Sequence, residues 1–163
     1  MNRESLACFR TSAFVSIDFS RLGTGMVDRD LILRKIADID LYLEQLRSYR
    51  EVELDAYRAD WKTQRIVERT LHLVIEVCMD VADHIVADRQ LRVPDTGAAT
   101  FDILAEAGVL ARPLADSLGR MVGFRNILVH DYARLDPSLV LRAIRTDVRD
   151  VQEFRDAILN TVG

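Results

Sequence analysis

The sequence predicts an all-α fold, an antiparallel bundle of four main helices plus short ones, and three observations lead to this prediction. Apolar residues recur at steps of three and four over most of the chain, which is the period of an α-helix. The chain has only three prolines and seven glycines in 163 residues, whereas an all-β fold needs turn residues every ten or so positions. No segment shows the alternation of apolar and polar residues that is typical of a strand.

The composition is that of an ordinary globular domain. Hydrophobic residues make up 49% of the chain and charged residues 29%, which excludes a mostly disordered protein. The 26 acidic residues outnumber the 22 Lys and Arg, so the formal charge is −4, and this argues against a protein that coats nucleic acid through bulk positive charge. No run of 18 apolar residues occurs, so we expect no membrane-spanning helix and a cytoplasmic location.

The cysteines and the first residues indicate the cellular setting and the extent of the domain. Cys8 and Cys78 lack the spacing of metal ligands, so we expect two reduced thiols and no metal site. Residues 1–25 show no clean periodicity, whereas a strong helical pattern begins just after Met26. We therefore expect 1–25 to be a poorly ordered N-terminal extension and 26–163 to be one helical domain, which a chain beginning at Met26 would retain at full stability.

The first part of the domain is predicted to contain two long helices joined by a short one. The first long helix spans 28–49 with Asp28 as its N-cap, and a short helical turn covers 53–59. The apolar positions of the first long helix are Ile32, Ile36, Ile39, Leu43 and Leu46. The second long helix spans 61–90, and so wide an apolar arc is typical of a central helix. Its seam consists of Val67, Leu71, Val74, Cys78, Val81 and Ile85, widened by Ile66, Leu73 and Val77.

The central helix also carries a row of polar residues at steps of three and four. The row consists of Arg65, Arg69, His72, Glu76, Asp80 and Asp83. One interpretation is a solvated face with ion pairs between successive turns. The other is a buried polar row that faces a site on a neighbouring helix.

Three further helices are predicted in the second part of the chain. A short helix over 98–107 ends near Gly108, as helices commonly do, and the next begins at 111–113 and runs to 132. The last helix spans 137–160 with Asp136 as its N-cap. Its apolar positions are Val140, Ile144, Val148, Val151, Phe154 and Ile158.

The helix that ends at 132 interrupts its own apolar register. The register is occupied by Leu114, Leu118, Met121 and Leu128. Arg125 stands where the next apolar residue is expected, and Tyr132 lies seven residues further on, about 20° round the helix. An unpaired charge in such a seam is costly, so Arg125 needs an acid, a phosphate or interfacial water as its partner.

His130 follows Arg125 by five residues, which is about 140° round an ideal helix. One helix therefore directs both groups at one point only if it frays near Val129, or if a second copy of the chain supplies part of the site. Gly119 and Gly123 permit a close backbone approach, either within the chain or at a homodimer seam.

A purely structural interpretation of the same residues stays open. In it, Arg125 forms an ion pair with Glu76 or Asp80 and has no chemical role. His130 then ends the helix near its negative pole, and Tyr132 packs against neighbours.

The segment MVGFRNILVHDY, residues 121–132, resembles the R-x4-H-x-Y signature of the HepT-like branch of the HEPN superfamily. The similarity includes Asn126 directly after the arginine, then an apolar triplet and His-x-Tyr. The segments 30–46 and 101–110, and the long helix with its polar row, are also similar to the layout of that family. The resemblance covers the chain from about residue 26 to the C-terminus and leaves 1–25 outside.

The resemblance implies an all-helical and commonly homodimeric protein, the toxin of a bacterial toxin–antitoxin system and a metal-independent endoribonuclease. Arg125 and His130 would be catalytic, and the supporting polar groups would be Asn126, Glu76 and Asp80. The partners would be the RNA substrate and an MntA-type nucleotidyltransferase antitoxin, which would silence the toxin by transferring AMP to Tyr132. We expect no cofactor, no metal, and no DNA or membrane partner.

The residue types suit that chemistry. An imidazole titrates near neutrality and can move protons between a 2′-hydroxyl and a leaving oxygen, at roughly 10²–10⁴-fold. A guanidinium is permanently charged and can hold two phosphate oxygens at once. Two alternatives remain: a non-catalytic scaffold or AMP acceptor whose motif holds a nucleotide or a partner, and a plain helical interaction module in which Arg125 is only structural.

Overall fold

The computed structural model describes residues 28–130 and 135–162, and within these ranges it contains helices and no strand. The elements are α1 (Arg29–Arg47), α2 (Leu54–Ala59), α3 (Trp61–Asp88), α4 (Gly97–Glu106), α5 (Arg112–His130), α6 (Pro137–Arg142), the π-helical turn η3 (Ala143–Asp147) and α7 (Val148–Val162). The prediction of an all-α fold is confirmed. The expected N-terminal extension, Cys8 and Tyr132 lie outside the described residues.

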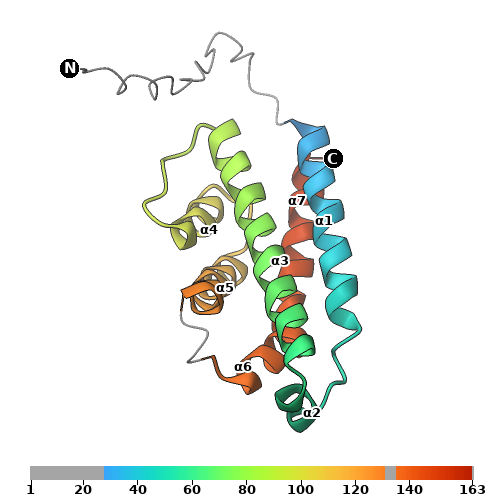
Figure 1. The fold of residues 1–163 in the computed structure, drawn as a ribbon. Helices are drawn as coiled ribbons and strands as arrows, with labels where there is room; N and C mark the ends of the chain where they lie inside the picture. Colours follow the sequence, from blue (N-terminus) through green and yellow to red (C-terminus); the bar gives the residue numbers. More distant parts are fainter. Residues whose placement is uncertain (1–27, 131–134, 163) are drawn as a thin grey trace, which may run out of the picture.

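The helices are arranged around α3, which runs through the middle of the molecule (Figure 1). α1 and α7 lie along one side of α3, and α1 runs antiparallel to both, while α4 and α5 pack on the other side (Figure 1). The short helices α2 and α6 contact each other at one end of the bundle. The described residues therefore form one core, in which Tyr57, Phe101 and Phe154 are the largest fully buried side chains.

Local sequence signals set the helix ends, as predicted. The Asp28 carboxylate accepts a hydrogen bond from the backbone N–H of Leu31 at 3.0 Å, and Asp136 accepts one from that of Ser138 at 2.9 Å. Gly108 follows the end of α4 with φ of +72°, a conformation that glycine adopts without strain. These caps fix where α1 and α6 begin and where α4 stops.

The apolar seam of α3 is buried along its whole predicted length, but the side that widens it differs from the prediction. Ile66 is 47% exposed, whereas Ile75, Ala82 and Val86 are buried. At about 100° per residue, these three lie on the opposite flank of the seam from Ile66. The predicted flank was therefore wrong for Ile66, because α4 and α5 cover the other one.

The last predicted helix is interrupted by the π-helical turn η3, which the periodicity did not reveal. A π turn disrupts the regular ladder of backbone bonds, and the Thr146 hydroxyl donates to the carbonyl of Arg142 at 2.8 Å. Arg145 donates from Nε to the carbonyl of Arg50 at 3.0 Å and from Nη2 to that of Val52 at 2.7 Å. These bonds join the turn to the loop that follows α1.

Candidate functional site

The motif helix α5 has a buried half and a more exposed half. Its buried residues are Leu114, Ala115, Leu118, Met121 and Val122. From Gly123 to His130 no residue is buried by the described part of the chain, and Ile127 is 40% exposed. We call the half that carries Arg125, Asn126 and His130 the open half. Asn126 and His130 are exposed, whereas Phe124 and Leu128 pack partly against the core.

Arg125 is held by two polar neighbours. Its Nε forms an ion pair with Oε1 of Glu76 on α3, and its Nη1 donates to Oδ1 of Asn126 at 3.2 Å. The Arg125 side chain is 22% exposed and that of Glu76 34%. The acid partner that the sequence required for Arg125 is thus Glu76. The ion pair fixes the guanidinium group, and the Nη2 atom of Arg125 has no hydrogen-bond partner among the described residues.

His72 lies one helical turn before Glu76 and interacts electrostatically with the same ion pair. Burial lowers the pKa of His72, and the positive charges of Arg69 and Arg125 lower it further, while Glu76 acts in the opposite direction. The lowered pKa favours the neutral form of the His72 imidazole. Sequence reasoning placed His72 in the polar row but not at the site, although its four-residue spacing from Glu76 was the available signal.

Asp80 turns away from Arg125. Its Oδ2 accepts a hydrogen bond from Nζ of Lys35 on α1 at 3.0 Å. Further along the row, Asp83 accepts a hydrogen bond from the Thr100 hydroxyl on α4 at 3.0 Å. The polar row of α3 is thus neither a purely solvated face nor one buried row, because successive carboxylates bind α5, α1 and α4 in turn.

His130 is the last residue of α5 and is exposed. The helix does not fray near Val129, so Arg125 and His130 keep an angular separation of about 140° on one helix. Of the two arrangements that would direct both groups at one point, fraying is excluded up to His130. The structure brings Arg125 together with Glu76 and Asn126, and leaves His130 apart from them on the helix surface.

The two glycines of α5 do not mark tight packing within the chain. A Cβ atom added at Gly123 would meet no atom within 4 Å, and one at Gly119 would meet only the Ala98 Cβ at 3.7 Å, an ordinary contact. Gly123 is followed by Asn126, Ile127 and His130 at helical spacing, and all four are exposed. The open side of α5 therefore presents a small residue in line with the motif side chains.

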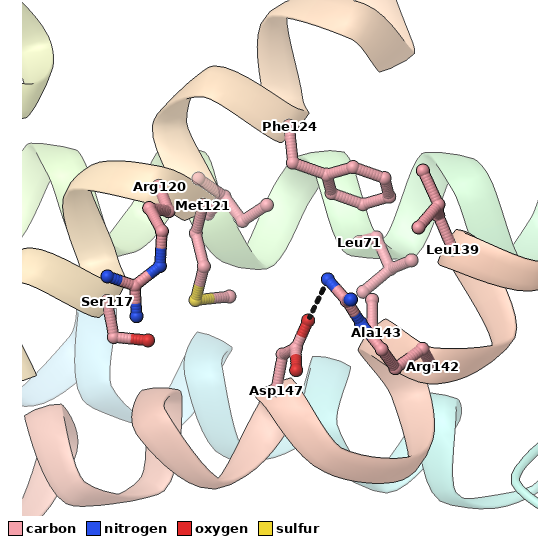
Figure 2. A pocket seen from close by; sticks show the side chains of 10 residues that line it. Leu71, Ser117, Arg120, Met121, Phe124, Leu139, Arg142, Ala143 and Asp147 are labelled. Atoms are coloured by element: carbon pink, nitrogen blue, oxygen red, sulfur yellow. Dashed lines mark ion pairs between the residues drawn. The ribbon is translucent and has the colours of Figure 1, made fainter. Parts of the chain in front are cut away.

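A cavity of about 250 Å³ lies beside α5, where it faces α3, α6 and η3 (Figure 2). Its apolar lining includes Leu71, Phe124 and Leu139, and its polar groups are Ser117, Arg120, Arg142 and Asp147. Arg142 pairs with Asp147 at 3.7 Å, whereas Arg120 has no ion-pair partner among the described residues. Apolar walls with a few charged groups are typical of small-molecule sites.

Comparison with known proteins gives the family. The family model described as Ribonuclease HepT-like matches residues 39–158. The chain belongs to this family. The HepT-like assignment agrees with the motif, since residues 125–132 fall inside the matched range.

Characterised relatives of this HepT-like chain are nucleases. The mRNA nuclease HepT of Shewanella oneidensis is 33% identical over 129 residues, which cover 79% of this chain and 96% of the relative. The tRNA nuclease HepT of Aphanizomenon flos-aquae is 32% identical, covering 70% of this chain and 78% of the relative. A solved structure of the tri-AMPylated Shewanella oneidensis HEPN toxin in complex with its MNT antitoxin has a TM-score of 0.75 at 32% identity, over 80% of this chain and 98% of that one.

Within the described part of this HepT-like chain, neither a metal-binding cluster nor a membrane-spanning helix is found. No group of three His, Cys, Asp or Glu side chains within it could hold a metal ion, and Cys78 is a buried free thiol whose pKa is raised by burial. None of its helices is long and apolar enough to cross a membrane.

The sequence analysis did not predict the cavity beside α5. Arg120 and Phe124 share a helix face, but their approach to Leu139 depends on tertiary packing.

Proposed function

We propose that this chain is the ribonuclease toxin of a bacterial toxin–antitoxin pair, that Arg125 and His130 cleave RNA without a metal, and that they act in a homodimer. The observation that supports this proposal is the open half of α5, which carries the exposed His130 and the partly exposed Arg125 on an unbroken helix. Membership of a ribonuclease family supports RNA as the substrate class. The cell compartment that fits such an activity is the cytoplasm.

Each site residue has a role that its surroundings permit. The exposed His130 imidazole moves protons between the 2′-hydroxyl and the leaving oxygen. Arg125, oriented by Glu76 and Asn126, presents its remaining N–H groups to the charge that develops on the phosphoryl oxygens. Asp80 supports the site indirectly, because its ion pair with Lys35 holds α3 against α1.

A second copy of the chain would complete the site. Arg125 and His130 point in directions about 140° apart on one helix, and α5 remains helical through His130. Two-fold pairing of the open α5 faces would place Arg125 of one copy near His130 of the other. Gly123 would allow the two helices to approach closely there, because no atom of its own chain occupies that space.

The partner would be an MntA-type nucleotidyltransferase that transfers AMP to Tyr132. Tyr132 lies two residues beyond His130 in the sequence, outside the described residues. An AMP group on its hydroxyl would add bulk and a negative phosphate beside the motif, and would compete with an RNA phosphate for Arg125. The AMPylated state of the Shewanella oneidensis toxin, solved with its antitoxin, supports this part of the proposal.

The proposal is tested by RNA cleavage in the presence of EDTA. The unchanged chain should cut RNA, and His130→Ala should lower the rate by roughly 10²–10⁴-fold without a change in melting temperature. His84→Ala is the matched control, because His84 is an exposed histidine on α3 outside the motif. Equal cutting by His130→Ala and the control would refute the catalytic assignment.

AMP transfer separates the enzyme from a non-catalytic acceptor. With an MntA-type nucleotidyltransferase and ATP, the chain should gain AMP. Tyr132→Phe should not gain it, whereas Tyr49→Phe should behave as the unchanged chain. Transfer of AMP to a chain that never cuts RNA would select the acceptor function. A chain that neither cuts RNA nor accepts AMP would leave Arg125 as a structural ion pair.

A further inference from the structure

A second hollow, of about 150 Å³, lies where the end of α1 meets η3 and the start of α7. Four of its nine lining residues are arginines and none is acidic. They are Leu43, Leu46, Arg47, Arg50, Ile144, Arg145, Val148, Arg149 and Gln152. We call this set of residues the arginine hollow. In a chain whose formal charge is −4, such a local excess of positive charge is not expected from composition.

Two of the four arginines are fixed in place by backbone carbonyls. Arg145 donates to the carbonyls of Arg50 and Val52, and Arg50 donates from Nη2 to the carbonyl of Arg145 at 3.3 Å. A carbonyl bond orients a guanidinium without neutralising its charge. Both side chains therefore keep a full positive charge in a defined geometry, and the Nη1 group of Arg145 has no hydrogen-bond partner among the described residues.

The charges of the arginine hollow are poorly balanced by the chain itself. Arg47 pairs with Glu44 at 3.1 Å, but both side chains are largely exposed. Within residues 28–130 and 135–162, no carboxylate lies within ion-pair distance of Arg50, Arg145 or Arg149. Arg145 and Arg149 are four residues apart, a spacing at which like charges repel each other on a helix. A bound anion would relieve this repulsion.

We propose that the arginine hollow binds a phosphate group of the RNA strand, away from the motif of α5. The inference rests on the proposed ribonuclease function and names where the substrate backbone is held. A guanidinium group can hold two phosphate oxygens at once. Four arginines line this hollow beside the buried apolar residues Leu43, Leu46 and Ile144. A chain without a basic stripe thereby gains a focused electrostatic contact with RNA.

The position of η3 connects this contact to the motif helix. Ala143 and Asp147 of η3 line the cavity beside α5, whereas Ile144 and Arg145 line the arginine hollow. The two openings therefore lie on two sides of the same π-helical turn. An RNA strand held at the arginine hollow is anchored on the same turn that lines the cavity beside α5.

The test measures RNA binding to the inactive His130→Ala chain. Arg149→Gln in that background should weaken binding of a short single-stranded RNA several-fold, and should reduce the slope of log affinity against log salt by about 0.7. Arg149 suits the test, because its side chain makes no hydrogen bond or ion pair with the described residues. Arg34→Gln on α1 is the matched control, since it removes one exposed charge outside the arginine hollow and should leave the slope unchanged.

Inorganic pyrophosphate provides a second readout that does not depend on nuclease activity. Its addition should shift the Nε–Hε NMR signal of Arg145, and Arg149→Gln should weaken this response while Arg34→Gln should not. If RNA binds and Arg149→Gln behaves as Arg34→Gln does, the inference is overturned and the proposed function stands. If the His130→Ala chain itself binds no RNA, both this inference and the proposed function on RNA fail. A pyrophosphate response that persists would then show a phosphate site of another use.

Discussion

The two halves of α5 contain similar apolar residues but meet different surroundings. In the first half, Leu118 and its neighbours at helical spacing are buried against α3 and α4, so packing holds the helix in place. In the second half, Phe124, Ile127 and Leu128 stay partly or largely exposed. The comparison teaches that the chain anchors the motif helix mainly through its first half, whereas no side chain of the second half is fully buried by the described residues.

The largest expected effect comes from the anchored half. Leu118→Ala should lower the free energy of unfolding by about 2–5 kcal/mol, because Leu118 is 2% exposed and its truncation leaves a cavity. Ile127→Ala, the matched change in the open half, should cost less than about 0.5 kcal/mol in the isolated chain. Urea unfolding of both variants measures the difference, and equal losses would show that the two halves are packed alike.

The next effect concerns the ion pair at the boundary between the halves. Arg125→Ala should destabilise the chain by about 1–2 kcal/mol, less than the 3–5 kcal/mol typical of a fully buried pair, because both side chains are partly exposed. The double variant with Glu76→Ala should lose less than the sum of the single losses. Additive losses in denaturant unfolding would mean that the ion pair makes no contribution.

A smaller effect, of opposite sign, is expected in the open half. Gly123→Ala should stabilise the isolated chain by about 0.5–1 kcal/mol, because alanine favours helix and the added methyl group meets no atom of the chain. The same change should weaken self-association in sedimentation experiments if the two α5 helices meet there. Gly119→Ala is the control, with an ordinary contact to Ala98. Unchanged self-association of Gly123→Ala would remove the glycine from the dimer interface.

The smallest effect is a pH dependence from His72. Its pKa is lowered in the folded chain, so the unfolded chain binds protons more readily as the pH falls below about 6.5. The free energy of unfolding should therefore decrease with acidification, and His72→Gln should lack this part of the decrease. Unfolding curves at neutral and mildly acidic pH, with His84→Gln as control, measure it. An identical acid sensitivity of His72→Gln and the unchanged chain would contradict the assignment.

Most of the fold was predictable because its signals are local. The apolar periods and the caps at Asp28, Asp136 and Gly108 placed the helices to within a few residues. The π-helical turn η3 was not predictable, since it inserts into an apolar pattern that a regular helix also satisfies. The carbonyl groups that bind Arg145 of η3 lie in the loop after α1, far away in the sequence, so no local pattern predicts these hydrogen bonds.

The candidate site was predictable in part. The interruption of an apolar register identified Arg125, and its need for an acid partner pointed to α3. The choice of Glu76 over Asp80 was not predictable, because the two share a polar row and differ only in which neighbouring helix each faces. The roles of Asn126, His130 and Tyr132 remain predictions, and the variants above address those of His130 and Tyr132.

The bonds from Arg145 to the loop after α1 have a consequence for the order in which the protein forms. They connect residues as many as 95 positions apart, so they close one of the longest loops in the fold. The ribosome synthesises α1 well before η3, so the carbonyls of Arg50 and Val52 lack their donor during the synthesis of more than half of the chain. The nascent protein therefore acquires its finished surface only as its final helix emerges.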